Sequence, residues 1–445
     1  MLAIIQAGGA GTRLKSITGD LPKPMVPLDG KPILEWQINS LKRAGVRSFI
    51  IVIGKNGKTI SRYFGDGKAF DVKIEYIEEK EPLGTAGVLA LLHDKIDDDF
   101  IFCFGDLMLD IDWQRFLAFH KEKGAVIAAF AHPNSHPYDS DILKTNKEGQ
   151  ILAIDSKNNV RDYYYENLTN AGVYICSKEV ASFVKEPTKI DFEKVVLSHF
   201  VEERKAYAYR SSEYVKDCGT PERYFDVEND LKNGIIAKKS LLNPQKCIFL
   251  DRDGTINVFA DFVRHPDALK LTPTASEAIR LINHSDYLAI CITNQPVLAR
   301  GEVSFEELDN IHFKMEDLLG ENGAYLNDLY FCPHHPDKGF PGEVKELKID
   351  CNCRKPKIGL LLKAKEKYNI DLSKSWFIGD TKQDIQTAIN AGCRSILLTT
   401  GDPKPNRKYE DAMPTYVCET LLEAVQYILK IEKTEDLTIN KSSKN

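Results

Sequence analysis

Residues 248–255 read IFLDRDGT, and this stretch decides the fold of the second half of the chain. Its apolar start predicts a buried strand, and two acids two positions apart, Asp251 and Asp253, follow directly. Parallel α/β sheets bind ligands at the carboxyl ends of their strands. Asp251 is therefore a candidate nucleophile toward phosphorus, and Asp253 a candidate acid and base. The alternative is an acidic turn without a catalytic role.

Two later segments favour the catalytic interpretation. A second apolar strand, 290–293, ends in Thr293 and Asn294, whose hydroxyl and backbone N–H are suited to phosphate oxygens. Arg354 and Lys355 supply cations for the same group.

Residues 378–384, IGDTKQD, end a further apolar strand with acids, of which Asp380 comes first. Together with Asp251 and Asp253, Asp380 is expected to hold Mg²⁺. Without that ion the carboxylates would repel an anionic substrate.

Cysteine and histidine residues cluster between these motifs, as CPHH at 332–335 and CNC at 351–353. Three thiolates and one imidazole make a closed tetrahedral zinc site, which is structural because no coordination position stays open. The expected ligands are Cys332, His334, Cys351 and Cys353, with His335 as the substitute for His334. Unrelated buried cysteines and histidines are the alternative, but the loop-like flanking residues disfavour it.

The chain has 445 residues, 43% of them hydrophobic and 28% charged, with a net charge of -6. This length predicts two domains of about 200 residues each. The net charge gives no attraction for nucleic acid or for an anionic membrane. We recognise no signal peptide, no apolar run of about 18 residues and no disulfide framework. A cytoplasmic protein is therefore expected.

Short apolar runs alternate with helical patterns in both halves, which predicts an α/β fold with two Rossmann-like sheets. The expected strands are 2–6, 49–53, 72–77 and 100–104 in the first half, and 247–250, 288–293, 329–331, 376–378 and 395–398 in the second. The expected organisation is a first domain at 1–233, a linker at 234–245, a second domain at 246–432 and a disordered polar tail at 433–445.

A glycine-rich turn, AGGAGTRL at 7–14, follows the first expected strand. Such a turn lets backbone N–H groups approach phosphates closely. It is not the dinucleotide fingerprint, because Leu14 replaces the third glycine, and no P-loop lysine follows. Arg13 and Lys23 add two cations, as a triphosphate requires. Asp106 and Asp217 are two acids that could share Mg²⁺ between two substrates. Taken singly, the glycine turn is equally well a tight connection, and each acid a cap or turn residue.

Together these segments resemble the sugar-phosphate nucleotidyltransferase family over about residues 1–230. The resemblance implies attack of a sugar 1-phosphate on the α-phosphate of a nucleoside triphosphate, with release of pyrophosphate. It implies that the nucleotide is bound by Gly8, Gly9, Gly11, Thr12, Arg13, Gly84, Thr85 and Ala86. It further implies that Lys23 offsets phosphate charge, that Asp106 and Asp217 hold Mg²⁺, and that Asn170 contacts the sugar. The Glu-Lys-Pro of the family is not evident, and Asp155-Ser156-Lys157 stands near its place.

The second half, from about 246 to 400, resembles the D-glycero-D-manno-heptose 1,7-bisphosphate phosphatases of the haloacid-dehalogenase superfamily. The segments that carry the resemblance are DRDGTIN at 251–257, TNQ at 293–295, ARG at 299–301, CPHH at 332–335 and CRKP at 353–356. Histidinol-phosphate phosphatases share the zinc loop, but the ARG segment favours the heptose branch. The chain departs from that branch at Pro296-Val297, where Ser-Gly is usual, and at Thr381, where lysine is common.

The implied roles in this half are phosphoryl contacts by Thr293 and Lys355, substrate contacts by Asn294 and Arg354, and Mg²⁺ ligands at Asp251, Asp253 and Asp380. Removal of the 7-phosphate would leave a heptose 1-phosphate, which the first half could join to GMP from GTP. The expected function is therefore bifunctional synthesis of a GDP-heptose from small sugar phosphates, without a nucleic-acid or membrane partner; a homo-oligomer remains open. The alternatives are a hexose 1-phosphate nucleotidyltransferase joined to a histidinol-phosphate-type phosphatase, or one domain that only senses a ligand.

Overall fold

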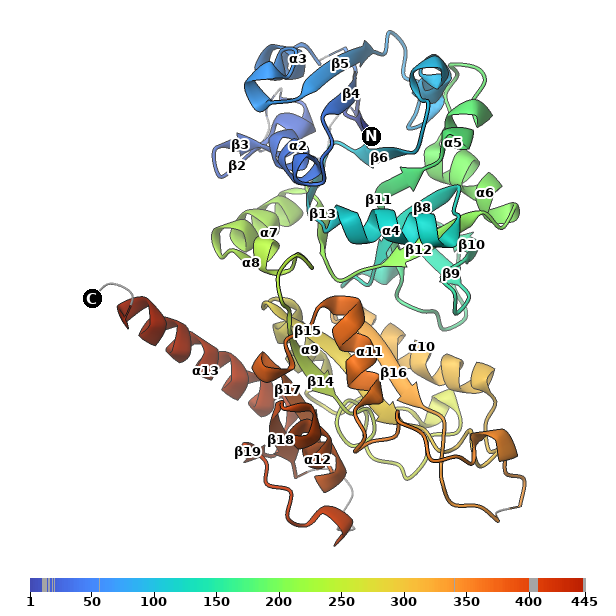
Figure 1. The fold of residues 1–445 in the computed structure, drawn as a ribbon, viewed down its shortest axis with the longest axis vertical. Helices are drawn as coiled ribbons and strands as arrows, with labels where there is room; N and C mark the ends of the chain where they lie inside the picture. The colour runs from blue at the N-terminus through green and yellow to red at the C-terminus, as the bar shows by residue number, and fades with distance from the viewer. Residues whose placement is uncertain are drawn as a thin grey trace. The chain divides into compact units, whose positions relative to one another are not determined.

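The computed structural model describes residues 1–9, 14, 17, 19, 21–55, 57–339, 341–399 and 407–442. The chain divides into two compact units, shown as a ribbon in Figure 1. Unit 1 comprises Met1–His132, Ser140–Asn159 and Leu168–Asn243, and unit 2 comprises Pro133–Asp139, Val160–Asn167 and Pro244–Asn445. Two short segments of the expected first domain thus group with unit 2. The expected linker is not extended throughout, because α8 (Ile235–Lys238) lies within it.

Unit 1 is built around a nine-stranded sheet. Its main strand order is β10-β9-β11-β6-β1-β4-β5; in addition, β8 pairs with β11, and β12 pairs with β8. Its strands are β1 (Leu2–Gln6), β4 (Ser48–Ile53), β5 (Lys73–Glu78), β6 (Phe100–Phe104), β8 (Ile127–His132), β9 (Ile142–Thr145), β10 (Ile151–Asp155), β11 (Thr169–Cys176) and β12 (Ala206–Arg210). Two small sheets pair β2 (Pro27–Leu28) with β3 (Lys31–Pro32), and β7 (Leu107–Asp110) with β13 (Tyr214–Asp217).

The four strands β6, β1, β4 and β5 are parallel, with β1 between β6 and β4. Successive residues of β1 point to opposite faces of the sheet, so Ile4 belongs to one apolar cluster while Ala3 and Ile5 belong to another. Because both faces are covered, these strands read as continuous apolar runs, as parallel strands usually do. The carboxyl ends of β1 and β6 mark the point where connections diverge, which is where such sheets bind ligands.

The helices of unit 1 are α2 (Ile33–Arg43), α3 (Lys58–Phe64), α4 (Trp113–Lys123), α5 (Lys178–Phe183), a π-helical turn at Phe192–Leu197, α6 (Ser198–Glu202), α7 (Pro221–Lys232) and α8. Helix α7 begins with Pro221 after the N-cap Thr220, whose hydroxyl oxygen accepts from the Arg223 N–H at 3.3 Å. A capping hydroxyl followed by proline is a common way to start a helix. This start fixes where Arg223 enters the site described below.

Unit 2 contains one six-stranded sheet in the order β16-β15-β14-β17-β18-β19, and all its pairs are parallel. Its strands are β14 (Lys246–Leu250), β15 (Tyr287–Asn294), β16 (Asp328–Cys332), β17 (Trp376–Gly379), β18 (Arg394–Leu398) and β19 (Tyr416–Cys418). In chain order this is 3-2-1-4-5-6, the Rossmann arrangement. The expected fold class is confirmed.

The helices of unit 2 are α9 (Ala275–Asn283), α10 (Phe305–Glu321), α11 (Gly359–Tyr368), α12 (Lys382–Ala391) and α13 (Leu421–Ser442). Helix α12 packs on β17 and β18 (Figure 1). Helix α13 extends to Ser442, whereas we expected a disordered tail from residue 433. The segment contains neither proline nor glycine, so nothing in the sequence stops the helix that starts in the core.

Candidate active sites and metal centre

The strand order of unit 2 locates its site at the carboxyl end of β14. β14 lies between β15 and β17, and the connections run outward from it in both directions. Ligands bind at such a switch point. Asp251 follows β14 and Asp380 follows β17, so the two predicted acids lie on neighbouring strand ends.

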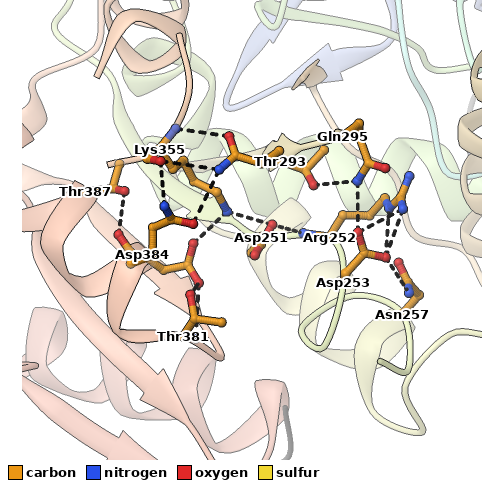
Figure 2. Close-up of polar contacts among 12 residues, drawn as sticks. Asp251, Arg252, Asp253, Asn257, Thr293, Gln295, Lys355, Thr381, Asp384 and Thr387 are labelled. Carbon is orange, nitrogen blue, oxygen red and sulfur yellow. Dashed lines mark hydrogen bonds and ion pairs between the residues drawn. The ribbon is translucent and has the colours of Figure 1, made fainter. Parts of the chain in front are cut away.

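Lys355 joins Asp251 to a second acid, Asp384, as Figure 2 shows. The Lys355 Nζ lies 2.8 Å from Asp251 Oδ1 and 2.6 Å from Asp384 Oδ1. The other oxygen of Asp384 accepts from the N–H and the hydroxyl of Thr381, at 3.1 and 2.6 Å, in the capping box of α12. Buried charges are tolerated when they are paired in this way. We assigned no separate role to Asp384 from the sequence, although its spacing from Thr381 matches a capping box.

The charges in this group alter one another's protonation. Burial, and secondly the negative charge of Asp384, raise the pKa of Asp251 to about 7, although Lys355 opposes the rise. Burial disfavours the Lys355 ammonium, but Asp251 and Asp384 outweigh burial and raise the pKa of Lys355 above its usual range. The lysine thus stays charged beside the candidate nucleophile, where it can also hold a phosphoryl oxygen.

Asp253 faces a different set of partners. Its carboxylate accepts from Arg252 Nη2 at 2.8 Å, from Gln295 Nε2 at 2.9 Å and from Asn257 Nδ2 at 3.1 Å (Figure 2). Burial opposes ionisation, but the Arg252 guanidinium and these hydrogen bonds lower the pKa of Asp253. Arg252 is fully buried, and its Nη1 lies 3.2 Å from Nε2 of His312, whose pKa burial holds well below the usual value.

Oxygen atoms of Asp251, Asp380 and Asp384 lie within 4.8 Å of one another and could hold a metal ion. Oxygen-only ligands suit Mg²⁺. The carboxylate of Asp380 presses against Gly254, where a Cβ would lie 2.1 Å from Asp380 Oδ2. We expected Asp253 in this set, but its carboxylate turns toward Arg252, and Asp384 takes the third place.

The last two residues of β15, Thr293 and Asn294, have different contacts. The Thr293 hydroxyl oxygen accepts from Gln295 Nε2 at 2.9 Å, which leaves its proton for another acceptor. We expected Asn294 to contact substrate. In the structure its side chain hydrogen-bonds to the backbone of Lys355. Its Oδ1 accepts from the Lys355 N–H at 3.0 Å and its Nδ2 donates to the Lys355 carbonyl at 3.4 Å. Asn294 therefore orients the lysine through the main chain.

The predicted zinc ligands converge in one group. Sγ of Cys353 lies 3.3 Å from Sγ of Cys332 and 3.2 Å from Sγ of Cys351, and His334 Nδ1 lies 3.2 Å from Cys353 Sγ. All four ligand atoms lie within 4.8 Å of one another, and three sulfurs with one imidazole nitrogen fit tetrahedral Zn²⁺.

The ring of His335 does not join this group. Its Nδ1 accepts from the Asp337 N–H at 3.2 Å. Of the two histidines that we considered, the geometry therefore selects His334. Arg354, one residue after Cys353, donates to the His334 carbonyl at 3.1 Å. The zinc loop thus holds the predicted cation Arg354 directly, and Lys355 follows it in the chain.

In unit 1, two predicted acids and a lysine come together near the carboxyl end of β6. In the pairing of β13 with β7, Asp217 lies opposite Leu107, and the Cys218 N–H donates to the Asp106 carbonyl at 3.1 Å. Lys23 Nζ lies 3.2 Å from Asp106 Oδ2. Asp217 is paired with Arg223 at 2.7 Å, a cation that we did not single out in the sequence. The predicted Mg²⁺ at Asp106 and Asp217 remains a prediction.

The glycine turn of unit 1 is described only in part. Gly8 and Gly9 follow β1, whereas Gly11, Thr12 and Arg13 lie outside the described residues. A Cβ on Gly8 would lie 3.0 Å from Glu79 Oε2. The turn therefore approaches a buried acid that we did not identify from the sequence.

The second turn, at residues 84–86, is locked to a neighbouring segment. Gly84 has φ +75°, and a Cβ there would lie 2.3 Å from the Ile190 carbonyl oxygen. The Thr85 hydroxyl oxygen accepts from the Phe192 N–H at 2.7 Å. Ala86 is fully buried, and its N–H donates to the Ile190 carbonyl at 3.0 Å. The predicted nucleotide contact of Ala86 is thus not supported by its side chain, which belongs to the core.

Asn170 belongs to a hydrogen-bonded triad. Its Nδ2 donates to the Tyr174 hydroxyl and to Glu193 Oε1, each at 2.7 Å, and Tyr174 donates to the same Glu193 oxygen at 3.0 Å. Burial raises the pKa of Glu193 to about 7. Nothing in the local sequence pattern distinguishes Glu193 from a surface helix acid, so only the fold reveals it. The triad fixes the orientation of the Asn170 amide.

Fold and sites together define a nucleotidyltransferase joined to a phosphatase of the haloacid-dehalogenase type. Residues 2–234 match the family model described as nucleotidyl transferase, and residues 352–424 match the model described as HAD-hydrolase-like. The chain belongs to the nucleotidyl transferase family and, through its second half, to the family of the heptose 1,7-bisphosphate 7-phosphatases.

Three relatives illustrate this. The D-glycero-beta-D-manno-heptose-1,7-bisphosphate 7-phosphatase of Vibrio cholerae is 35% identical over 187 residues, 42% of this chain and 97% of the relative. The mannose-1-phosphate guanylyltransferase of Mycobacterium tuberculosis is 29% identical over 242 residues, 54% of this chain and 67% of the relative. The crystal structure of the D,D-heptose 1,7-bisphosphate phosphatase of B. bronchiseptica, complexed with magnesium and phosphate, is 34% identical and covers 42% of this chain and 99% of that one, with a TM-score of 0.36.

The families support a bifunctional enzyme of heptose metabolism that acts on sugar phosphates and nucleotides. Within the residues that the structure describes, no helix has the length and apolarity that a membrane span needs.

Proposed function

We propose that the second half removes the 7-phosphate of D-glycero-D-manno-heptose 1,7-bisphosphate and that the first half transfers GMP from GTP to the resulting heptose 1-phosphate. The products would be phosphate, pyrophosphate and a GDP-heptose. The observation that carries the proposal is the convergence of Asp251, Lys355 and Asp384 in a half of the chain that is 35% identical, over 187 residues, to a heptose bisphosphate 7-phosphatase.

In the phosphatase step, an oxygen of Asp251 attacks phosphorus, the bond to O7 breaks, and an aspartyl-phosphate forms. Lys355 and the Thr293 hydroxyl bind phosphoryl oxygens. Asp253 gives a proton to O7, and its ionised form then takes a proton from water, which attacks the phosphorus and releases phosphate. The arriving phosphate dianion raises the pKa of Asp253, because like charges disfavour ionisation, so the acid step becomes accessible.

Asp251, Asp380 and Asp384 would hold Mg²⁺, which neutralises phosphate charge. The zinc centre would have no chemical role, because its four protein ligands close the coordination sphere. It would hold Arg354 and, through the chain, Lys355.

In the transfer step, a phosphate oxygen of the heptose 1-phosphate attacks the α-phosphorus of GTP, and pyrophosphate leaves. Lys23, which pairs with Asp106, would offset charge on the reacting phosphates, and Asp106 and Asp217 are the proposed Mg²⁺ ligands. Asn170 would contact the sugar, with its amide oriented by Tyr174 and Glu193. The similarity to a mannose-1-phosphate guanylyltransferase supports guanine and keeps mannose 1-phosphate as the second candidate sugar.

The fusion agrees with consecutive steps, because the phosphatase product has the anomeric phosphate that a nucleotidyltransferase requires. The decisive experiment supplies each anomer of the heptose bisphosphate with Mg²⁺ and GTP, ATP, CTP or UTP, and follows phosphate and pyrophosphate separately. Both products from one anomer with GTP would support the proposal. Phosphate without pyrophosphate for every nucleotide would retain the phosphatase and reject the heptose as substrate of the first half. A parallel assay supplies histidinol phosphate. Its turnover, with none of the heptose bisphosphate, would reject the heptose as substrate of both halves.

A further inference from the structure

Arg252 stands between the two candidate catalytic acids of unit 2, and its side chain is fully buried. Its main-chain N–H donates to Asp251 Oδ1 at 2.7 Å, and its carbonyl oxygen accepts from the N–H groups of Ile256 and Asn257 at 2.9 and 3.0 Å. The backbone of Arg252 is therefore fixed in the turn that follows β14. A guanidinium without water costs free energy unless other groups accept from its N–H donors, so each of its partners matters.

The guanidinium of Arg252 holds the carboxylate of Asp253. Its Nε donates to Asp253 Oδ1 at 3.2 Å, and its Nη2 lies 2.9 Å from Oδ1 and 2.8 Å from Oδ2 (Figure 2). Asn257 Nδ2 donates to Oδ1 and Gln295 Nε2 to Oδ2, so both oxygens are held. The Asp253 side chain is still 21% exposed. The carboxylate is therefore fixed in one orientation, with part of its surface open to a ligand.

The orientation of Asp253 matters because of the role proposed for it. A carboxyl group that moves a proton must meet the reacting oxygen at hydrogen-bond distance and from the correct direction. The contacts of Asp253 also keep it outside the group of Asp251, Asp380 and Asp384 that could hold a metal ion. Arg252 thus reserves this carboxylate for proton transfer.

The remaining end of the guanidinium contacts His312, which lies 60 residues later in the chain, on α10. Arg252 Nη1 lies 3.2 Å from His312 Nε2. Arginine has only N–H donors, so Nε2 must be the acceptor and the ring carries its proton on Nδ1. Burial of the ring and the charge of Arg252 both lower the pKa of His312, which agrees with this neutral form.

His312 is itself held by packing. Its side chain is buried on α10, whose first turn is closed by a capping box between Ser304 and Glu307, and its ring centroid lies 5.4 Å from that of Phe331. Arg252 and Asp253 are adjacent in the chain, so contacts between these two alone would let both side chains turn together. An acceptor on a separate helix prevents this, because it fixes the far end of the guanidinium.

We propose that His312 is a positioning residue of the phosphatase, which acts through Arg252 to hold Asp253 in the direction that proton transfer requires. This inference rests on the proposed function, in which Asp253 protonates the leaving oxygen as its bond to phosphorus breaks and the bond from Asp251 to phosphorus forms. In the second step Asp253 takes a proton from water as the water oxygen attacks phosphorus and the bond to Asp251 breaks. Without the acceptor on α10, Nη1 of Arg252 would be buried and unsatisfied, and the guanidinium would turn and draw Asp253 with it.

This role makes the effect of His312 depend on the leaving group. The O7 of a heptose is a poor leaving group unless it receives a proton, whereas p-nitrophenolate leaves readily as an anion. A misaligned Asp253 should therefore slow the cleavage of the heptose bisphosphate and spare that of p-nitrophenyl phosphate. The quantity to compare is kcat/KM, because it covers the steps up to departure of the leaving group and does not include the attack of water.

The test replaces His312 by Leu, which has no acceptor, and by Gln, whose Oε1 lies near the place of Nε2. With Mg²⁺, His312→Leu should lower kcat/KM for the heptose bisphosphate by about 100-fold, as expected for a misplaced catalytic group. For p-nitrophenyl phosphate the loss should be about threefold or less, since that ester does not require the acid. His312→Gln restores an acceptor and should stay within about fivefold of the unmodified chain on the heptose bisphosphate. Asn310→Leu, at an exposed position of α10, is the matched control and should change neither value.

The two esters separate positioning from folding, because a damaged fold would lower the turnover of both equally. If His312→Leu does not fold, His312→Asn, whose amide is too short to reach Arg252, takes its place in the same comparison. Equal losses on the two esters, no loss on the heptose bisphosphate, or a His312→Gln variant as slow as His312→Leu would overturn the role of His312 and leave the proposed function standing. No phosphate from either ester with the unmodified chain would instead reject the proposed phosphatase and this inference with it.

Discussion

The two sites of this chain hold their charged groups in different surroundings. In unit 2, the side chains of Asp251, Lys355 and Asp384 are 12%, 3% and 0% exposed. In unit 1, Lys23 and Asp106 are 15% and 28% exposed, and Arg223 and Asp217 are 31% and 36% exposed. Both sites have carboxylates beside a cation. These charged groups are buried in unit 2 and partly solvated in unit 1.

This difference determines how much each site depends on its own protein partners. Desolvated charges must be satisfied by the fold, so in unit 2 Lys355 and a capping box hold Asp251 and Asp384, and a guanidinium with two amides holds Asp253. Solvated charges can exchange partners cheaply, so in unit 1 Lys23 and Arg223 can leave the acids when substrate or metal arrives. We therefore expect the phosphatase site to be organised before its substrate binds and the transferase site to be completed by its ligands.

The largest effect is expected from Asp251→Asn. The amide is no nucleophile, so phosphate release should fall by about 10⁴-fold or more, whereas nucleotidyl transfer should persist. Separate assays of phosphate and pyrophosphate on one preparation provide the measurement. Asp267→Asn, at an exposed position in the short 3-10 helix Pro266–Ala268, should alter neither activity. Loss of both activities in folded Asp251→Asn would show that the sites are not independent.

The contrast in burial is tested next by removing the cation from each site. Lys355→Met leaves two buried acids without their partner and should lower the free energy of unfolding of the second half by about 3–5 kcal/mol. Lys23→Met, in the more solvated site, should cost the first half about 1 kcal/mol or less. Urea unfolding followed by a probe in each half would measure both. Equal losses would mean that burial does not distinguish the sites.

Removal of zinc should act on the second half alone. The ion would close a loop between Cys332 and Cys353, and a covalent cross-link of that size contributes about 3 kcal/mol. A chelator should therefore lower the melting transition of the second half and leave that of the first unchanged. Cys393→Ser, at a cysteine outside the metal group, is the control and should leave the response to the chelator unchanged. A metal-free preparation with unchanged melting would contradict a structural zinc.

The smallest effect concerns Glu193, whose folded-state pKa of about 7 lies above the usual value of 4.5 because of burial. The folded protein then binds a proton more readily than the unfolded chain between those values, so stability rises as pH falls through 7. From pH 7 to pH 5 the gain should be about 2 kcal/mol for the first half. Glu193→Gln keeps an acceptor for Asn170 and Tyr174 but should lose this pH dependence. An unchanged slope would assign the titration to another group.

Residues near strand ends could be predicted because a short apolar run and the polar residues after it are a local pattern. Asp251 and Asp380 come directly after or close after expected strands and Thr293 ends one, and the structure places each at the carboxyl edge of one sheet. The candidate zinc ligands could be predicted for the same reason, since Cys332 and His334, and Cys351 and Cys353, are two residues apart and so close in space. The fold class followed from the same alternation of strands and helices.

Orientation could not be predicted in this way. Asp253 follows β14 and Asp384 lies in the first turn of α12, but only the packing of Arg252, Gln295 and Asn257 turns Asp253 away from the group that could hold a metal. Asn294 ends a strand like a ligand residue and yet holds the backbone of Lys355. Side-chain direction depends on partners remote in sequence, and no local pattern records them.

The sequence by itself determined the α/β class, the strands that carry the candidate residues and the residue types suited to phosphoryl and zinc chemistry, because these follow from periodicity and spacing along the chain. It did not reveal β8, β9, β10, β11 and β12 of the unit 1 sheet. Only the tertiary structure revealed Glu79 beside Gly8, Glu193 beneath Asn170 and Asp384 against Lys355. Glu79 and Glu193 come from segments without a motif, Asp384 ends a motif that gave it no role of its own, and each acquires its environment by burial against residues from 23 to 73 positions away. A buried charge obtains its role from the groups that replace its water, and the fold alone brings those groups together.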